Sequence, residues 1–465
     1  MRTWKVLTLG LALLIQSLAY AGNEHEHLQY LPSYEEIFKA SGGKLGSYPA
    51  KNVISNPVMM LQVLGEESFS RLLPPKVALR VQGKMNIQGI TQALGSWPDQ
   101  YTFAQACEKM SLVSSGRLKP EQIMKSFFSS DSLEGYITSG QVRNTLFEKR
   151  PALLVQAIEE HLKTSPLSVF NKNAFSVPKF LVNRSVLGRL KNIYESRGAQ
   201  VKFYYSLPRN ILAKPSFDFQ GTLAGMSEGI QEGWLHGIDI SGSIREGVAP
   251  DPAGKSAIFG ERFEQLFKFS HDKKIAVRIH AYEGTRTGAF YDGFWKSFNE
   301  CAVKNCAPHQ LRIGHIQALG EEDIDRLSQL TKSRSIVFEA NIESNVKLQS
   351  GTETQKLAKT IEKIHAENMR VVIGADGLGI LGESANFENT LLRLKTAGLS
   401  EKSLERLLRD AHLPISGTRI SKAQVLEWQR ERTEVRNRVL GSEVKSIYRG
   451  PCRIDQALER LVRAR

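Results

Sequence analysis

The sequence predicts an α/β fold, a (β/α)8 TIM barrel with an N-terminal helical extension and a C-terminal helix. From residue 76 onward, short apolar or β-branched runs alternate with longer amphipathic segments, which is typical of parallel βα units. Polar side chains recur where these runs end, and in such a barrel the carboxyl ends of all strands meet at one face. A doubly wound sheet would gather them at one switch point instead, so their spread over five runs favours the barrel.

The elements follow in order along the chain. The strand candidates are 76–81, 201–206, 235–241, 275–281, 311–316, 335–341 and 370–376. The clearest helical candidates are 34–41, 261–274, 321–330, 354–368 and 398–411. The polar residues at the strand ends are Asp239, His280, His315, Glu339 and Asp376.

Residues 1–21 are typical of a secretory signal peptide. A basic start at Arg2 and Lys5 precedes a short apolar run, and Ala19-Tyr20-Ala21 is a small-x-small cleavage site. We therefore expect an exported protein, periplasmic or secreted. The apolar run is too short to span a bilayer, and no later stretch reaches the roughly 20 apolar residues that a membrane helix needs.

The remaining chain divides into three predicted segments. Residues 22–75 form a helical N-terminal extension, 76–420 form the barrel with a helix-rich insertion at about 99–165, and 421–465 form a basic helical tail. The chain has a net charge of +14, from 62 Lys and Arg against 48 Asp and Glu. Such a balance favours an anionic surface as a partner of the tail, although charge that serves solubility alone is the alternative.

Four cysteines in so long a chain do not form a disulfide framework. Export would permit disulfides, so Cys301 and Cys306 could close a small loop, and Cys107 and Cys452 a long one. Free, buried thiols are the alternative for each pair.

Several runs resemble the adenosine deaminase family, zinc barrels of the amidohydrolase superfamily. IHAYEG resembles the family's H-A-x-E signature, and LRIGH resembles its R-I/L-G-H strand. The other matching runs, in order along the chain, are GIDISG at 237–242, FEANIESNV at 338–346, RVVIGAD at 370–376 and GLSEKSLERLLRDA at 398–411. The signal peptide and helical lead-in resemble most the family's secreted, growth-factor-like branch.

The resemblance implies a role for each matching residue. His280 and Asp376 would ligate zinc, and Asp376 would also take a proton. Glu283 would protonate the purine ring, and His315 would orient the attacking hydroxide. Two glycines, Gly242 and Gly377, would contact the substrate, a purine nucleoside or a nucleotide-like small molecule.

The family opens its barrel with an H-x-H pair of zinc ligands, and the segment PKVALRVQGK at 75–84 resembles that strand. Arg80 and Gln82 occupy the two histidine positions, so the metal set is incomplete there. An arginine cannot ligate zinc, and a glutamine is a poor ligand. The family's second consecutive aspartate is also missing, because Gly377 follows Asp376.

Zinc lowers the pKa of water from about 16 to about 7, roughly 12 kcal/mol toward hydroxide. A general base contributes only about 3–5 kcal/mol, so a barrel without zinc would not deaminate. One other source of ligands exists. The segment GNEHEH contains an H-x-H pair, His25 and His27, either on an arm that enters the barrel or on a solvated terminus.

GLGILG at 377–382 matches the dinucleotide pattern GxGxxG, but it comes late in the chain and lacks the acidic residue that should follow. A phosphate-cradling loop is a weaker alternative for this segment.

Three functions remain open from the sequence. The first is an exported pseudoenzyme with a degraded zinc site and no cofactor, which binds a purine-like ligand or a partner. The second is an active Zn²⁺-dependent hydrolase that deaminates adenosine or a related purine nucleoside. The third is a basic surface-interaction protein with a vestigial pocket. A homodimer is open in every case.

Overall fold

We describe the protein from a computed structural model. The structure describes residues 25–42, 133–164, 172–197, 199–241, 255–282, 288–330, 336–348, 354–381, 387–411, 430 and 433–440. The chain divides into two compact units. The first comprises Met1–Leu28, Thr164–Asp376 and Ser384–Arg465, and the second comprises Gln29–Lys163 and Gly377–Glu383.

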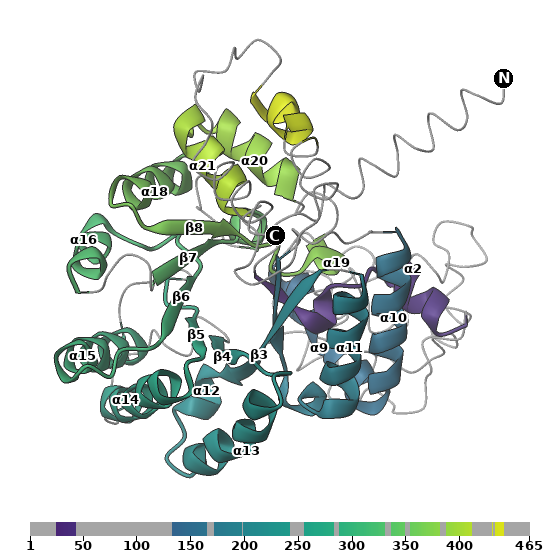
Figure 1. The fold of residues 1–465 in the computed structure, drawn as a ribbon, viewed down its shortest axis with the longest axis horizontal. Helices are drawn as coiled ribbons and strands as arrows, with labels where there is room; N and C mark the ends of the chain where they lie inside the picture. Colours follow the sequence, from purple (N-terminus) through teal and green to yellow (C-terminus); the bar gives the residue numbers. More distant parts are fainter. Residues whose placement is uncertain are drawn as a thin grey trace, which may run out of the picture. The chain divides into compact units, whose positions relative to one another are not determined.

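The first unit is built on one parallel sheet of eight strands in which every strand pairs with the next one along the chain. The strands are β1 Glu26–His27, β2 Lys172–Val177, β3 Gln200–Pro208, β4 Gly237–Ser241, β5 Ala276–Ile279, β6 Gln310–Gly314, β7 Ile336–Ala340 and β8 Arg370–Ile373. Strands β3 to β8 can be followed in sequence order in Figure 1. This order, with helices in the crossovers, confirms the predicted α/β fold of the (β/α)8 type.

The two edges of the sheet also meet. The N–H of Asp376, just after β8, donates to the carbonyl oxygen of His25 at 3.0 Å. A Cβ placed on Gly374 would lie 2.4 Å from the Cβ of His25, so only a glycine permits this approach. The seam between β8 and β1 is therefore closed by direct backbone contact.

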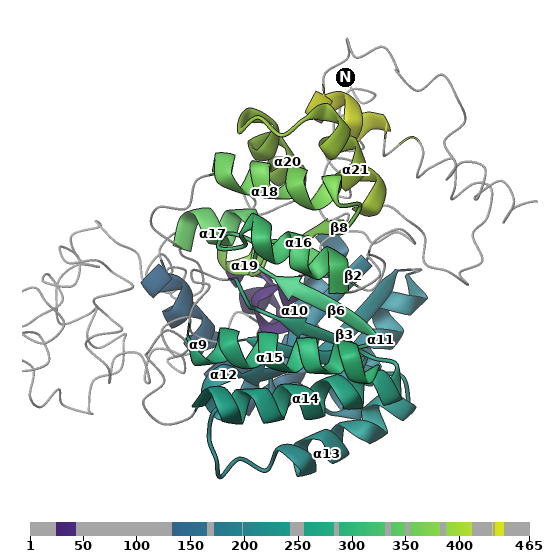
Figure 2. The same cartoon turned by 90° about the vertical axis from the view of Figure 1, so that its left-hand side faces the viewer.

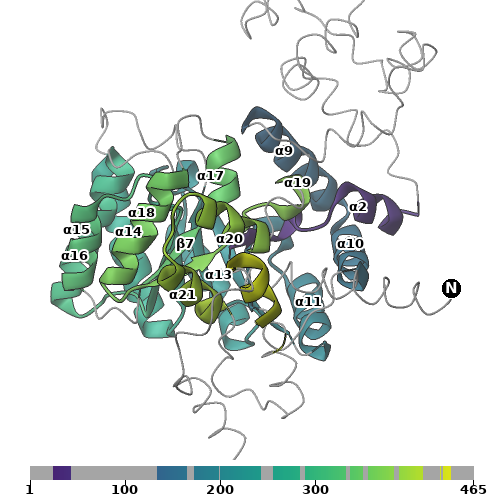
Figure 3. The ribbon, with the colours of Figure 1, turned by 90° about the horizontal axis from the view of Figure 1, so that it is seen from above.

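Helices follow most strands and cover the outer side of the sheet. The helices of the first unit are η2 Lys179–Leu181, α11 Arg184–Ser196, α12 Arg209–Leu212, α13 Phe219–Gln231, α14 Lys255–Lys273, α15 Ala289–Lys304, α16 Glu321–Leu330, α17 Ile342–Leu348, α18 Thr354–Ala366, α20 Phe387–Thr396 and α21 Glu401–Ala411. Figures 1 and 3 both place α14, α15, α16 and α18 along the outer side of the strands.

Helices α14 and α15 lie side by side (Figure 2) and pack through aromatic side chains. Phe263 and Phe267 are spaced four residues apart on α14, and Phe290 and Phe294 have the same spacing on α15. The rings of Phe263 and Phe290 meet edge to face at 5.2 Å between centroids. The four-residue spacing places these rings on one face of each helix, which explains the amphipathic pattern of the 261–274 segment.

The interior of the sheet contains a large aromatic ring. Tyr204 is buried with Ala174 and Ala276, which are small enough to leave room for it. A Cβ on Gly237 would lie 2.4 Å from the Tyr204 ring, so the glycine that opens β4 also makes room for this side chain.

The second unit contains η1 Leu28–Tyr30 in large part, α2 Tyr34–Ala40, α9 Leu133–Lys149, α10 Pro151–Thr164 and α19 Leu378–Leu381. The buried guanidinium of Arg143 on α9 donates to the carbonyl oxygens of Pro32 at 2.6 Å and Gly379 at 3.0 Å. Arg143 thus joins the chain segment that follows β1 to the segment that follows β8.

The described elements can be compared with those predicted. Strands were expected at β3 to β8 and are present there, and the described part of the 99–165 insertion is helical, as expected. Within the predicted helical extension at 22–75, residues 26–27 form β1 and residues 34–40 form the helix α2. The segments 1–21 and 75–84 lie outside the described residues, as do the boundaries at 75 and 420.

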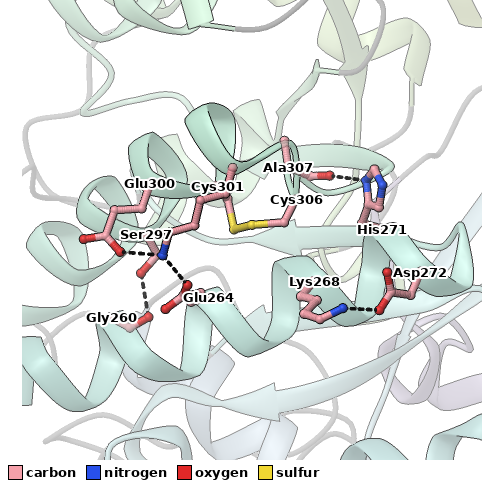
Figure 4. The surroundings of a disulfide bond; sticks show 11 residues. Gly260, Glu264, Lys268, His271, Asp272, Ser297, Glu300, Cys301, Cys306 and Ala307 are labelled. Carbon is pink, nitrogen blue, oxygen red and sulfur yellow. Dashed lines mark hydrogen bonds and ion pairs between the residues drawn. A yellow bond between two sulfur atoms is a disulfide. The ribbon is translucent and has the colours of Figure 1, made fainter.

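The disulfide prediction is confirmed for one cysteine pair. Cys301, in the last turn of α15, is bonded to Cys306 (Figure 4). Asn305 between them ends the helix in the left-handed conformation, with φ of 55°, and lets the Cys306 N–H reach the Cys301 carbonyl at 2.9 Å. Cys107 and Cys452 lie outside the described residues.

Within the described part of the chain, no helix is both long enough and apolar enough to cross a bilayer.

Candidate metal centre

Four histidines and one aspartate meet at the carboxyl end of the sheet. His25 directly precedes the two-residue strand β1 and His27 is its last residue. His280 and His315 directly follow β5 and β6, and Asp376 comes three residues after β8. Since all strands are parallel, their carboxyl ends face the same side, and residues distant in sequence converge there. His27 retains slight exposure, and the other four side chains are buried.

The distances between these side chains are short. The ring of His25 lies 4.7 Å from that of His280 and 5.5 Å from that of His315, between centroids. Oδ1 of Asp376 lies 3.3 Å from Nε2 of His25 and 3.4 Å from Nε2 of His27. In each of two triads, His25–His280–His315 and His25–His27–Asp376, one donor atom per residue lies within 4.8 Å of the others. The two triads share His25, so they describe one centre.

These residues fit a divalent transition metal. Imidazole nitrogen and carboxylate oxygen are donors that zinc accepts. Nε2 of His25 is buried and makes no hydrogen bond to any of the described residues. A buried nitrogen without a hydrogen bond is costly unless another group satisfies it, and a metal ion would do so.

Two residues of the centre have an unusual backbone. His315 has φ of 61° and Asp376 has φ of 60°, both in the left-handed region that non-glycine residues rarely adopt. Such conformations persist where the surrounding structure enforces them, commonly at functional sites. Here the Asp376 N–H bond to His25 holds one of them, and a 2.7 Å bond from Nδ1 of His315 to Oδ1 of Asn345 holds the other.

Buried carboxylates orient two of the rings. Oε2 of Glu339, in β7, lies 2.5 Å from Nδ1 of His25, which directs Nε2 of that ring toward the centre. Oδ1 of Asp239, in β4, lies 3.2 Å from Nε2 of His280. Both carboxylates therefore contact a histidine of the centre directly.

The carboxyl groups of Glu339, Asp239 and Asp376 all have a pKa below the ordinary value. Burial raises the pKa of Glu339, but Arg278, Arg312 and His25 outweigh burial and hold that pKa well below its ordinary value. For Asp239, the effect of burial is likewise exceeded, chiefly by His280 and Arg278, so its pKa is lowered. The pKa of Asp376 is also held well below its ordinary value, because His315 and His25 outweigh the effect of burial.

A short strand lies at one edge of the sheet. The strand that pairs with β2 is Glu26–His27, so an H-x-H pair, His25 and His27, lies at this edge. The prediction that Arg80 and Gln82 occupy the family's two histidine positions stays a prediction. The placement of Arg80 and Gln82 themselves lies outside the described residues.

The other predicted site residues have different outcomes. His280, His315 and Asp376 come together as described above. Gly242 and Glu283 lie outside the described residues. Gly377 belongs to the second unit, has φ of 150°, and would place a Cβ 2.8 Å from the Tyr136 ring, which gives it a local structural reason to be glycine.

Sequence reasoning missed the residues that support the centre. Asn345, Arg278 and Arg312 were not singled out, although Asn345 and Arg312 lie within runs that resemble the family and Arg278 directly precedes one. The signal was available in the strands, because a charged residue inside an otherwise apolar strand is seldom buried without a partner. The GLGILG segment contains the short helix α19 at Leu378–Leu381.

No protein-family model and no curated protein matches the chain. Among solved structures, a match is the crystal structure of an amidohydrolase from Burkholderia ambifaria with bound zinc. The match covers 93% of this chain and 95% of that one, at 11% sequence identity and a TM-score of 0.40. So low a TM-score supports no inference about fold or site, and both rest on the strand order and the geometry given above.

Proposed function

We propose that the protein is a metal-dependent hydrolase that removes the amino group of adenosine or a related purine nucleoside. The convergence of His25 and His27 with His280, His315 and Asp376 carries this proposal. The pseudoenzyme alternative depended on a missing H-x-H pair, and the position of His25 and His27 at the edge of the sheet supports the active alternative. The choice of a purine nucleoside rests on the resemblance of the 237–242, 279–284 and 311–315 runs to adenosine deaminases.

His25, His27, His280 and Asp376 would hold the metal, a Zn²⁺ ion. A zinc ion in such a site supplies Lewis-acid activation of water at neutral pH. The protein's own part is to orient the reactants and to move protons. Nε2 of His315 lies 3.7 Å from Oδ2 of Asp376, so this pair is placed to receive the proton that the attacking water gives up.

Glu283 follows His280 by three residues, and the resemblance assigns to it the protonation of the purine ring. A carboxylic acid in that role makes the ring carbon more electrophilic and helps ammonia to leave. Its contribution would be about 10²–10⁴-fold in rate, which is typical of a positioned general acid.

We also propose that the protein is exported. The Cys301–Cys306 disulfide supports this proposal, because disulfides persist in oxidising compartments and are rare in the cytosol. Two arginines near the C-terminus are used within the fold: Arg436 pairs with Glu405, and Arg438 with Glu388 at 2.6 Å. These pairs weaken the alternative in which the basic tail serves mainly an external anionic partner.

Metal content and activity test the proposed function together. Purified protein, dialysed against trace zinc, should retain about one zinc per chain by plasma mass spectrometry. The double variant His25→Ala/His27→Ala should lose it, and Arg80→Ala/Gln82→Ala should keep it. His271→Ala, an exposed histidine, is the matched control. Zinc-loaded wild type should also convert adenosine to inosine.

Two results would overturn the proposal. Wild type that retains no zinc would contradict the metal centre. If the Arg80/Gln82 variant lost zinc and the His25/His27 variant kept it, residues 75–84 would be the segment that forms the first strand of the barrel. Zinc-loaded protein that is inert toward purine nucleosides would refute the proposed substrate class but leave the metal centre in place.

A further inference from the structure

A continuous chain of buried polar side chains runs through the sheet interior beneath the candidate metal centre. It begins with Nδ1 of His25 bonded to Glu339 at 2.5 Å, and Nε of Arg278 then donates to Glu339 at 3.1 Å. Nη1 of Arg278 donates to Oγ of Ser176 at 3.1 Å, and that hydroxyl donates to Oδ2 of Asp239. Oδ1 of Asp239 lies 3.2 Å from Nε2 of His280.

Because the side chains of this polar chain are buried, the loss of any one bond affects its neighbours. Its six residues lie in or directly next to β1, β2, β4, β5 and β7, and none is more than 3% exposed. In an interior of low dielectric constant, breaking one link leaves two groups without their partners, and the neighbours must shift to satisfy them. A disturbance at one histidine can therefore reach the other.

Arg278 contacts both halves of this chain of polar side chains. Its Nε serves Glu339 and thereby His25, while its Nη1 serves Ser176 and thereby Asp239 and His280. The ring of Tyr204 lies under this guanidinium, 4.6 Å from its Cζ, and helps to fix its plane. A lysine would retain the charge but could not reproduce this forked geometry.

A second arginine, Arg312, contacts the same carboxylate as Arg278. It pairs with Arg278 in register on the next strand and its Nε also donates to Glu339. Arg312 therefore supports the His25 half of this chain of polar side chains.

We propose that Arg278 is a positioning residue that couples the ring orientations of His25 and His280, so that the two histidines act as one unit toward a bound metal. The inference deepens the proposed function and rests on it for the zinc measurements below. Its structural part concerns the side chains of the protein alone and can be tested without metal.

The first test is a set of zinc affinities measured by competition with a chromogenic chelator. Removing a group that orients a metal ligand typically weakens metal binding by about 10–100-fold. Arg278→Lys should fall in this range. Glu339→Gln and Asp239→Asn should each weaken zinc binding, and the double variant should fall short of the product of the two effects by about threefold or more, as coupled sites do.

The second test uses metal-free protein with ¹⁵N-labelled histidine. Arg278→Lys should shift the ring signals of both His25 and His280, and Arg312→Lys, which alters a second bond to Glu339, should shift those of His25. Ser176→Ala removes the middle link but leaves every charge in place, so it replaces Arg278→Lys if that variant does not fold. It should again alter both histidines, and far-ultraviolet circular dichroism confirms the fold of each variant.

The outcomes separate the two proposals. Wild type that binds no zinc would refute the proposed function, and the metal-free spectra would still decide the coupling. Strictly multiplicative effects in the double variant, or an Arg278→Lys spectrum in which only His25 changes, would refute the coupling even if zinc binds tightly.

Discussion

At the residue scale, the seam between the first and last strands depends on one missing side chain. A Cβ on Gly374 would lie 2.4 Å from Oδ1 of Asn341 and 2.8 Å from the carbonyl oxygen of His25, distances that real Cβ atoms do not show. The same backbone carries Asp376 toward the metal centre. Gly374 therefore connects the closure of the sheet with the geometry of the site.

We predict that Gly374→Ala destabilises the protein by about 1–3 kcal/mol, the usual effect of overpacking, and weakens zinc binding. Gly225, in α13, is the matched control, because a Cβ there meets nothing within 4 Å. Gly225→Ala should instead stabilise the helix by about 0.5–1 kcal/mol. Urea unfolding measures both, and equal effects of the two substitutions would contradict the role of the seam.

A second residue, His365 of α18, links stability to pH. Burial, reinforced by Arg406 and opposed by Glu362, lowers the pKa of His365 to about 3, and its Nδ1 lies 2.9 Å from Oγ of Ser403 on α21. The folded state therefore keeps this imidazole neutral, while the unfolded chain protonates it near pH 6.5. Protons bind the unfolded state first, so stability falls as the pH drops from about 6.5 toward 3.

We expect His365→Gln to reduce this dependence. The slope of unfolding free energy against pH between 7 and 5 should be smaller in the variant than in wild type. The difference should be at most the slope that the uptake of about one proton on unfolding produces. Urea unfolding at pH 5, 6 and 7 measures the slope. An unchanged slope would show that His365 does not carry the effect. His271→Gln, an exposed histidine, serves as the control.

At the scale of elements, the Cys301–Cys306 bond fastens the end of α15 to the segment that leads into β6. The bond joins residues only five positions apart, so it restricts the unfolded chain less than a long loop would. It nevertheless lies where the chain turns toward the strand that carries His315.

We predict that Cys301→Ser/Cys306→Ser lowers the unfolding free energy by about 2 kcal/mol, which the loop-entropy relation gives for so small a loop, and leaves zinc stoichiometry unchanged. Differential scanning calorimetry should show a melting temperature lower by a few degrees. Reduction of wild type with dithiothreitol should reproduce that shift. A loss of zinc in the variant would contradict a purely local role.

At the scale of the whole molecule, the candidate metal centre brings together residues at the ends of β1, β5, β6 and β8. These strands belong to one sheet but are far apart in sequence. Strand β1 has only two residues, so few ladder hydrogen bonds hold it. A metal ion shared by His25, His27 and Asp376 would tie this short strand to β8.

We therefore predict that zinc stabilises the fold as a whole. Free zinc at about one hundred times its dissociation constant should add about 2.7 kcal/mol to the unfolding free energy, and a chelator should remove that gain. Thermal unfolding with zinc and with chelator measures the difference. The His25→Ala/His27→Ala variant should show no shift, and a shift that persists in it would mean that zinc binds elsewhere.

The fold was largely predictable from local sequence. Strands β3 to β8 and helices α16, α18 and α21 were predicted because apolar periodicity marks a long element reliably. Strands β1 and β2 were missed for different reasons. Strand β1 is too short to show any period, and β2, at Lys172–Val177, follows the predicted insertion without a clear turn signal.

What the sequence alone determined is the class of fold and three members of the centre, His280, His315 and Asp376, since each ends an apolar strand of its own. Only the tertiary structure brings His25 and His27 to these three residues. The PKVALRVQGK run resembles the family's first strand but lies outside the described residues, and the strand that pairs with β2 is Glu26–His27. The physical reason is that the bond from His25 to Glu339 joins residues 314 positions apart, and contacts at that separation leave no local pattern.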